Sequence, residues 1–142
     1  MRRFSGLSGL VFIREITYNI WEMRCKAMKH EAIARTNHKS GCNCAQSVFA
    51  AFAEELGVSV DEAKRMAPRP RSEGGKCGAF LAARALLRQL RPEAAEAFER
   101  RFADLNGMTE CSLLVKSHDR LGKSCNDYVG DAARLADEAL GN

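Results

Sequence analysis

Apolar residues recur three and four positions apart along most of the chain, which is the spacing of residues on one face of a helix. Only three of the 142 residues are proline and 7% are aromatic, so a sandwich of many short strands is not expected. The sequence therefore predicts an all-α fold, a single compact domain of about five to seven helices. The clearest apolar face consists of Phe80, Leu81, Ala83, Leu86, Leu87 and Leu90.

Capping residues divide the chain into its expected helices. Side chains that can accept hydrogen bonds from the free N–H groups of a first helical turn precede four segments. These candidate N-caps are Asn43, Ser59, Thr109 and Ser124. Gly57 is a candidate stop after the second helix. The expected helices cover 22–35, 44–56, 60–67, 77–90, 92–106, 110–117 and 125–140.

Aromatic side chains at helical spacing are expected to form the core. They are Phe49, Phe52, Phe80, Phe98 and Phe102. In the helix over 92–106, the residues expected to face inward are Ala95, Phe98, Phe102 and Leu105.

The net charge of +4 comes from one end of the chain. Residues 1–30 carry six basic and two acidic residues, whereas the remaining 112 carry sixteen of each. A neutral body has no basic face for a phosphate backbone, so nucleic-acid binding is not expected. No run of about 18 apolar residues is present either, so no membrane span is expected.

Residues 1–22 are predicted to form an N-terminal extension outside the core, and residues 23–142 to form the domain. Arg2 and Arg3 precede a short apolar run, but Arg14 and Glu15 break it and no secretory cleavage site follows. We therefore expect a cytoplasmic protein.

The cysteines carry most of the chemical information. Four of them lie in the first turn of four different predicted helices, after a cap residue or a Gly-Gly pair: Cys44, Cys77, Cys111 and Cys125. The positive end of the helix dipole favours thiolate over thiol, so this placement predicts lowered thiol pKa values. The two remaining cysteines are Cys25 and Cys42.

Four converging thiolates could bind an iron–sulfur cluster of the 2Fe–2S or 4Fe–4S type, bind a zinc ion, or cycle as dithiol/disulfide pairs. The chain has no Cys-x-x-Cys sequence, which argues against a zinc ribbon and a thioredoxin-type site. It has no Cys-x-x-Cys-His either, so covalently attached haem is not expected.

Three further residues give weaker signals. His38 and His118 flank cysteine segments and could complete a mixed Cys/His zinc site, although exposure at helix ends explains both more simply. Cys42 could act as a resolving thiol for Cys44, but two residues this close in sequence form a strained pair.

Four ordered segments resemble the C_GCAxxG_C_C family of redox proteins. They are Gly41-Cys42-Asn43-Cys44-Ala45-Gln46, Gly74-Gly75-Lys76-Cys77-Gly78-Ala79, Cys111-Ser112-Leu113-Leu114 and Cys125 to Val129. The resemblance covers roughly residues 31–140. One departure stands out, because Ala82 occupies the position of the final glycine of the family's central motif.

The resemblance implies an all-helical domain with a redox role. A related domain accompanies the haems of split-Soret cytochromes and is linked there to an iron–sulfur centre, but this chain shares only that domain and no haem is expected. The family's functional cysteines correspond to Cys44, Cys77, Cys111 and Cys125, whereas Cys25 and Cys42 lie outside the set.

Three functions therefore follow as hypotheses. The favoured one is an electron-transfer protein with an iron–sulfur cluster on the four cysteines, because converging thiolates need a positive counter-charge. The second is a thiol oxidoreductase with Cys44 or Cys77 as nucleophile, and the third is a zinc-stabilised interaction module. Nothing in the sequence identifies the redox partner, and a homodimer that shares the site between chains is also considered.

Overall fold

The computed structural model describes residues 29–141, apart from the side chains of Asp119 and Arg120. Within this part of the chain all regular structure is helical, which confirms the predicted all-α class. Lys76 and Glu110 form an isolated antiparallel bridge between two loops. The predicted extension over 1–22 and Cys25 lie outside the described residues.

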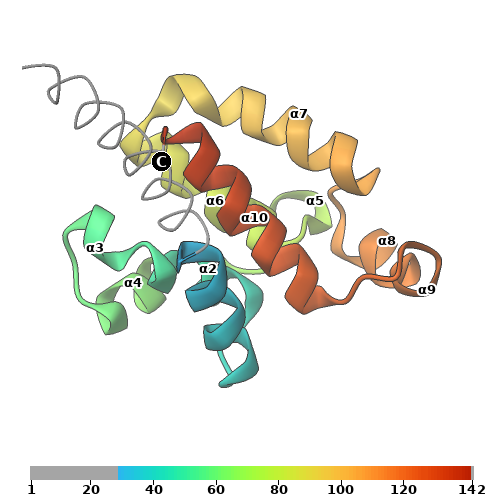
Figure 1. Ribbon diagram of the computed structural model, residues 1–142, viewed down its shortest axis with the longest axis horizontal. Coiled ribbons are helices and arrows are strands. Elements are labelled where there is room, and N and C mark those ends of the chain that lie inside the picture. Colours follow the sequence, from blue (N-terminus) through green and yellow to red (C-terminus); the bar gives the residue numbers. More distant parts are fainter. Residues whose placement is uncertain (1–28, 142) are drawn as a thin grey trace, which may run out of the picture.

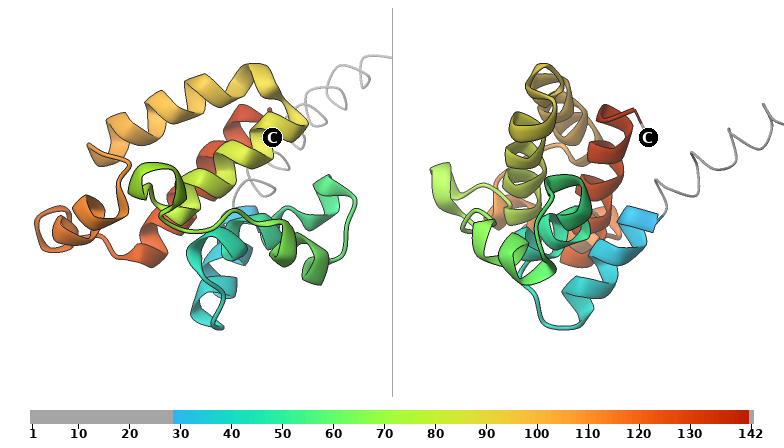
Figure 2. Two further views of the ribbon diagram at one scale, coloured as in Figure 1. Left: turned by 180° about the vertical axis from the view of Figure 1, so that it is seen from behind. Right: turned by 90° about the vertical axis from the view of Figure 1, so that its left-hand side faces the viewer.

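Three helices form the centre of the molecule: α2 (Cys44–Ala51), α6 (Gly78–Leu90) and α10 (Cys125–Ala139), each in contact with the other two. α7 (Ala95–Asn106) covers one side of the α6–α10 pair, and α4 (Val60–Met66) packs against α2 on the other side (Figures 1 and 2). The cysteine-bearing beginnings of the central helices are therefore held by a packed core.

Shorter elements connect these helices. They are α3 (Ala53–Leu56), α5 (Ser72–Gly75), the 3₁₀ turn η1 (Pro92–Ala94), α8 (Cys111–Lys116) and α9 (His118–Leu121). A further helix over 29–39 precedes α2. The described residues thus contain more helices than the sequence predicted, partly because α5 and α9 are single turns that no periodic pattern marks.

Small and aromatic side chains share the core. Alanines at Ala79, Ala82 and Ala83 are fully buried on α6, and alanine both favours the helix and lets neighbouring helices approach closely. All five aromatic residues predicted for the core are buried. The Phe80 ring lies 5.7 Å from Phe98 and 5.3 Å from Phe102, centroid to centroid.

Two of the predicted caps precede cysteines that begin helices. Asn43 accepts a hydrogen bond from the Gln46 backbone N–H at 2.8 Å, and the Gln46 side chain accepts one from Asn43 N–H at 3.2 Å. At α10 the Ser124 N–H donates to the Asp127 carboxylate at 2.9 Å. These capping boxes fix where α2 and α10 begin.

Three expectations about the helices are wrong. The helix predicted over 44–56 is divided at Phe52, whose ring stacks on His30 at 4.3 Å. Thr109 does not cap α8, because Glu110 occupies the N-cap position. Leu105 is 46% exposed, whereas its neighbour Asn106 is 2% exposed and takes the inward position.

The loop before α6 is tied down by a buried charge. Arg84 of α6 is buried, lies over the Phe80 ring and pairs with Glu73 of α5. Arg71 and Glu73 have positive φ values of 65° and 52°, a conformation that non-glycine residues rarely adopt. The ion pair holds this unusual turn in place a few residues before Cys77. None of the helices in the described part of the chain is both long and apolar enough to cross a membrane.

Candidate functional site

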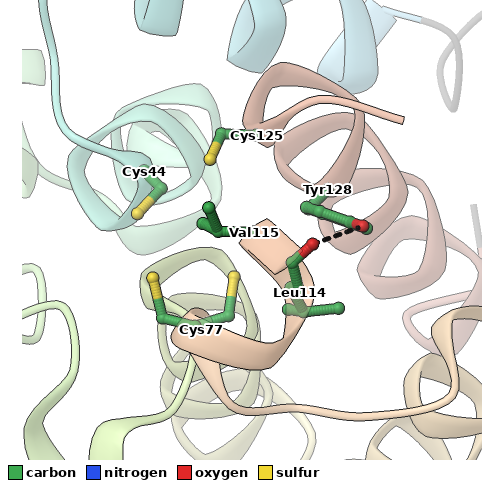
Figure 3. A pocket seen from close by; sticks show the side chains of 7 residues that line it. Cys44, Cys77, Leu114, Val115, Cys125 and Tyr128 are labelled. Carbon is green, nitrogen blue, oxygen red and sulfur yellow. Dashed lines mark hydrogen bonds between the residues drawn. The ribbon is translucent and has the colours of Figure 1, made fainter. Parts of the chain in front are cut away.

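Four cysteines from four parts of the sequence line one cavity. Cys44, Cys111 and Cys125 are the first residues of α2, α8 and α10, and Cys77 is the N-cap residue of α6. The complete lining is Cys44, Cys77, Cys111, Leu114, Val115, Cys125 and Tyr128. Figure 3 shows the side chains of Cys44, Cys77 and Cys125 directed toward this common space from their separate elements.

Backbone pairing brings Cys77 and Cys111 to the same place. The Cys77 N–H donates to the Thr109 carbonyl at 2.7 Å, and Lys76 bridges to Glu110. The start of α6 therefore lies beside the start of α8, although a whole helix pair separates them in sequence. Thr109 thus contributes through its main chain and not as the predicted cap.

Gly78 leaves room for the sulfur of Cys44. A Cβ atom at Gly78 would lie 2.6 Å from Cys44 Sγ and 3.1 Å from the Cβ of Pro70, and real Cβ atoms essentially never make contacts as short as the first. The glycine after Cys77 is therefore needed so that α2 and α6 can bring their cysteines together.

The wall opposite the sulfurs is apolar and partly open. The Tyr128 hydroxyl is buried and donates to the Leu114 carbonyl at 3.2 Å, which joins α10 to α8 (Figure 3). Val115 lines the cavity and is 46% exposed, so it lies at the mouth. The cavity has a volume of about 260 Å³, which includes the space at its mouth that is open to solvent.

Burial controls the thiol pKa values. It raises the pKa of Cys77 to about 12, although hydrogen bonds from the backbone N–H groups of Phe80 and Ala79 lower it. Burial also raises the pKa of Cys44, and the neighbouring Cys111 raises it further. Hydrogen bonds from the backbone N–H groups of Gly78 and Ala45 lower the pKa of Cys44 but do not cancel this rise.

Cys125 follows the same rule, because burial first, and then Cys111 and Cys44, raise the pKa of its thiol. The prediction of lowered pKa values is therefore wrong in direction for Cys44, Cys77 and Cys125. Helix N–H groups do favour the thiolate, but removing the sulfur from water outweighs them. At neutral pH these sulfurs carry protons unless a bound cation displaces them.

Comparison with known proteins agrees with this arrangement. Residues 42–139 match the family described as "Putative redox-active protein (C_GCAxxG_C_C)". The chain belongs to this family. The matched region contains all four cysteines of the cavity. Searches of the curated proteins and of the solved structures returned no match.

The departure from the family motif lies outside the cavity lining. Ala82 is fully buried on α6, but it is not among the residues that line the cavity. Its methyl group packs in the helical core, whereas the motif glycine that contacts a cysteine, Gly78, is present.

The two histidines differ in their surroundings. His118 Nε2 lies 3.8 Å from Cys125 Sγ, so it is close to the site, whereas His38 contacts the Asn126 side chain at 3.2 Å. Cys42 has a free thiol and does not line the cavity. The four cysteines that line the cavity are the ones that the sequence singled out, whereas Gly78 appeared there only within a motif and Tyr128 was given no role. The available signals were a glycine directly after Cys77 and a tyrosine one helical turn after Cys125.

The cavity offers four thiol sulfurs as possible ligands for a metal centre. All five described cysteines have free thiols. Within residues 29–141, no three His, Cys, Asp or Glu side chains gather closely enough to hold one metal ion. A single zinc ion draws all four sulfur ligands to about 2.3 Å, whereas a cluster divides them among its iron atoms, one cysteine per iron in the 4Fe–4S type and two per iron in the 2Fe–2S type.

Proposed function

We propose that this member of the redox-active family is an electron-transfer protein that binds an iron–sulfur cluster through Cys44, Cys77, Cys111 and Cys125. The observation that carries the proposal is the convergence of these cysteines, from four separate elements, on one partly open apolar cavity. When bound, such a cluster supplies a centre that takes one electron from a donor protein and passes it to an acceptor protein.

The chain itself provides the ligands and the surroundings. The thiols must lose their protons to bind iron, and the raised pKa values mean that binding displaces protons that burial would otherwise retain. Leu114 and Tyr128 keep water from the inner side of the sulfurs, because both side chains are buried. The exposed position of Val115 leaves one side open, and a redox partner would approach from there.

The free thiols also fit a reducing compartment, and a cytoplasmic location is part of this proposal. Disulfides are rare in that compartment because thiol reductants keep cysteines reduced.

The test is a purification without oxygen, followed by a visible absorption spectrum and assays of iron, sulfide and zinc on the same sample. We expect broad sulfur-to-iron charge-transfer bands with iron and labile sulfide in equal amounts. A colourless, metal-free protein whose titratable thiols change by two or four on oxidation would replace the proposal with dithiol chemistry. Stoichiometric zinc without iron would indicate a zinc-stabilised interaction module.

Serine variants identify the ligands. Replacing Cys77 by Ser, or any other cysteine of the cavity, should abolish the visible bands, because serine is a poor ligand for iron in such clusters. Cys42→Ser is the matched control, since Cys42 lies two residues from Cys44 but outside the cavity. Equal loss of colour in the Cys42 variant would contradict the assignment.

A further inference from the structure

One imidazole lies beside the cysteine cavity without being part of its lining. His118 belongs to α9, the single turn between α8 and α10, and its Nε2 atom is 3.8 Å from Cys125 Sγ. Its ring is tilted against that of Tyr128, with 5.7 Å between the centroids. Its carbonyl accepts a hydrogen bond from the Lys123 N–H at 3.1 Å, which closes the turn that carries it.

The chemistry of the two groups fixes the direction of this contact when Cys125 is a ligand. A ligating cysteine is a thiolate and has no proton to donate. A neutral imidazole has one N–H, and either nitrogen can carry it. The only hydrogen bond that can join the pair is therefore one from Nε2–H of His118 to the sulfur of Cys125.

We infer that His118 is a positioning residue that donates a hydrogen bond to the Cys125 sulfur and thereby raises the reduction potential of the centre. This inference rests on the proposed function. Reduction adds negative charge that spreads onto the ligand sulfurs, so a fixed donor stabilises the reduced form more than the oxidised form. Among the described residues, Cys125 is the cavity cysteine with an imidazole in hydrogen-bonding contact.

The variants separate the hydrogen bond from the packing of the ring. His118→Phe keeps an aromatic ring against Tyr128 but removes the N–H, and His118→Gln retains a neutral N–H donor. His38→Phe is the matched control, because His38 contacts the Asn126 side chain and not a sulfur. Each protein is purified without oxygen, checked for iron and sulfide content, and titrated potentiometrically at one pH.

We expect His118→Phe to lower the equilibrium constant for reduction about tenfold, which is about 59 mV for a one-electron couple. His118→Gln should have a reduction potential close to that of the wild type, because it retains an N–H donor. His38→Phe should have the same reduction potential as the wild type. A merely structural role of His118 would change thermal stability without this ordered effect on potential.

A second measurement on the wild type keeps the test decisive if the Phe variant does not retain its iron. Pulsed electron paramagnetic resonance of the reduced protein, labelled with nitrogen-15 histidine, should show one weak nitrogen coupling. A strong coupling would mean that His118 is an iron ligand, which would overturn the inference. The absence of any nitrogen coupling would also overturn it, because His118 would then make no contact with the centre.

Two failures remain distinguishable. Unchanged potentials in variants that hold a full complement of iron and sulfide would overturn the role of His118 and leave the proposed function standing. Wild-type protein without iron and sulfide would overturn the proposed function and this inference together.

Discussion

At the scale of single residues, Gly78 decides how closely two cysteine-bearing helices can meet. Its place at the start of α6 has ordinary helical geometry, so alanine there would favour the helix by up to about 1 kcal/mol. The added methyl group would nevertheless meet Cys44 Sγ at 2.6 Å and the Pro70 ring. Overpacking of this kind typically costs about 1–3 kcal/mol.

We therefore expect Gly78→Ala to lower the iron and sulfide content several-fold, measured per chain after purification without oxygen. Gly130→Ala is a matched control, because Gly130 lies on α10 away from the cavity and its new Cβ would also meet a side chain, the guanidinium of Arg35. The Arg35 guanidinium would have to shift from its ion pairs with Glu31 and Asp127, and none of these three residues lines the cavity. Equal iron contents in the two variants would refute the role given to Gly78.

At the scale of single helices, the caps determine where the cysteines lie in their first turns. Asn43→Ala removes the side-chain acceptor of the capping box at α2, which should destabilise the protein by about 1 kcal/mol. Because Cys44 is the next residue, iron content should also fall. The measurements are urea unfolding and iron assay.

Ser59→Ala tests whether the second effect is specific. Ser59 caps α4 by accepting a hydrogen bond from the Glu62 N–H at 3.1 Å, far along the chain from any cavity cysteine. The Ser59→Ala variant should lose a similar free energy of unfolding, about 1 kcal/mol, but its iron content should stay normal. A loss of iron in both variants would mean that stability alone controls binding.

The same scale shows what local patterns predict and where they fail. The caps at Asn43 and Ser124 were recognisable because hydrogen-bonding side chains at helix starts act locally. The inward face of α7 was misassigned at Leu105. Its buried positions continue from Phe102 to Asn106, which accepts a hydrogen bond from Lys123 Nζ at 2.7 Å. Asn106 can be buried because Lys123, distant in sequence, donates a hydrogen bond to its side chain. The spacing of apolar residues along a helix cannot predict such a contact.

The break at Phe52 has the same origin. No glycine or proline marks it, and the ring is instead stacked on His30 from a different helix. Tertiary contacts therefore set this helix end, whereas the left-handed Gly57 after α3 was predictable from sequence.

At the scale of the whole molecule, His30 connects three elements. Its Nε2 lies 2.8 Å from the Glu55 carboxylate of α3, and its Nδ1 lies 2.9 Å from the buried Asp137 carboxylate of α10. The hydrogen bond to Asp137 raises the pKa of His30 above the ordinary value of 6.5, although burial opposes it. The protonated ring is therefore favoured in the folded protein.

This pKa shift predicts a pH dependence of stability. Because the pKa of His30 is raised in the folded protein, its protonation adds to the free energy of unfolding. This stabilisation is complete below about pH 6.5, the ordinary value, and is lost as the pH rises through the folded-state pKa. His30→Gln should be less stable than the wild type by about 1.5–3 kcal/mol at pH 6, because it removes the charged hydrogen bonds from His30 to Asp137 and Glu55. The difference should shrink toward pH 9. The measurement is urea unfolding of both proteins from pH 6 to pH 9. A difference in the free energy of unfolding that stays constant over this range would contradict the prediction.

The convergence of the cysteines could be predicted only in part. Their places at helix starts were visible in the sequence, but their meeting depends on the backbone bridge from Lys76 to Glu110 and on the packing of α2, α6 and α10. These are long-range contacts, and a single sequence gives no signal for them. The raised thiol pKa values were missed for the same reason, since burial depends on the assembled fold.

The dispersed origin of the four cysteines also sets an order of events during synthesis. The chain emerges from the ribosome with Cys44 first and Cys125 last, and the latter opens the helix that closes the core. Until α10 has left the exit tunnel and docked, three thiols share an unfinished cavity. Under the proposed function, the centre can be completed only after α10 has docked, and the nascent chain must be kept reduced until then.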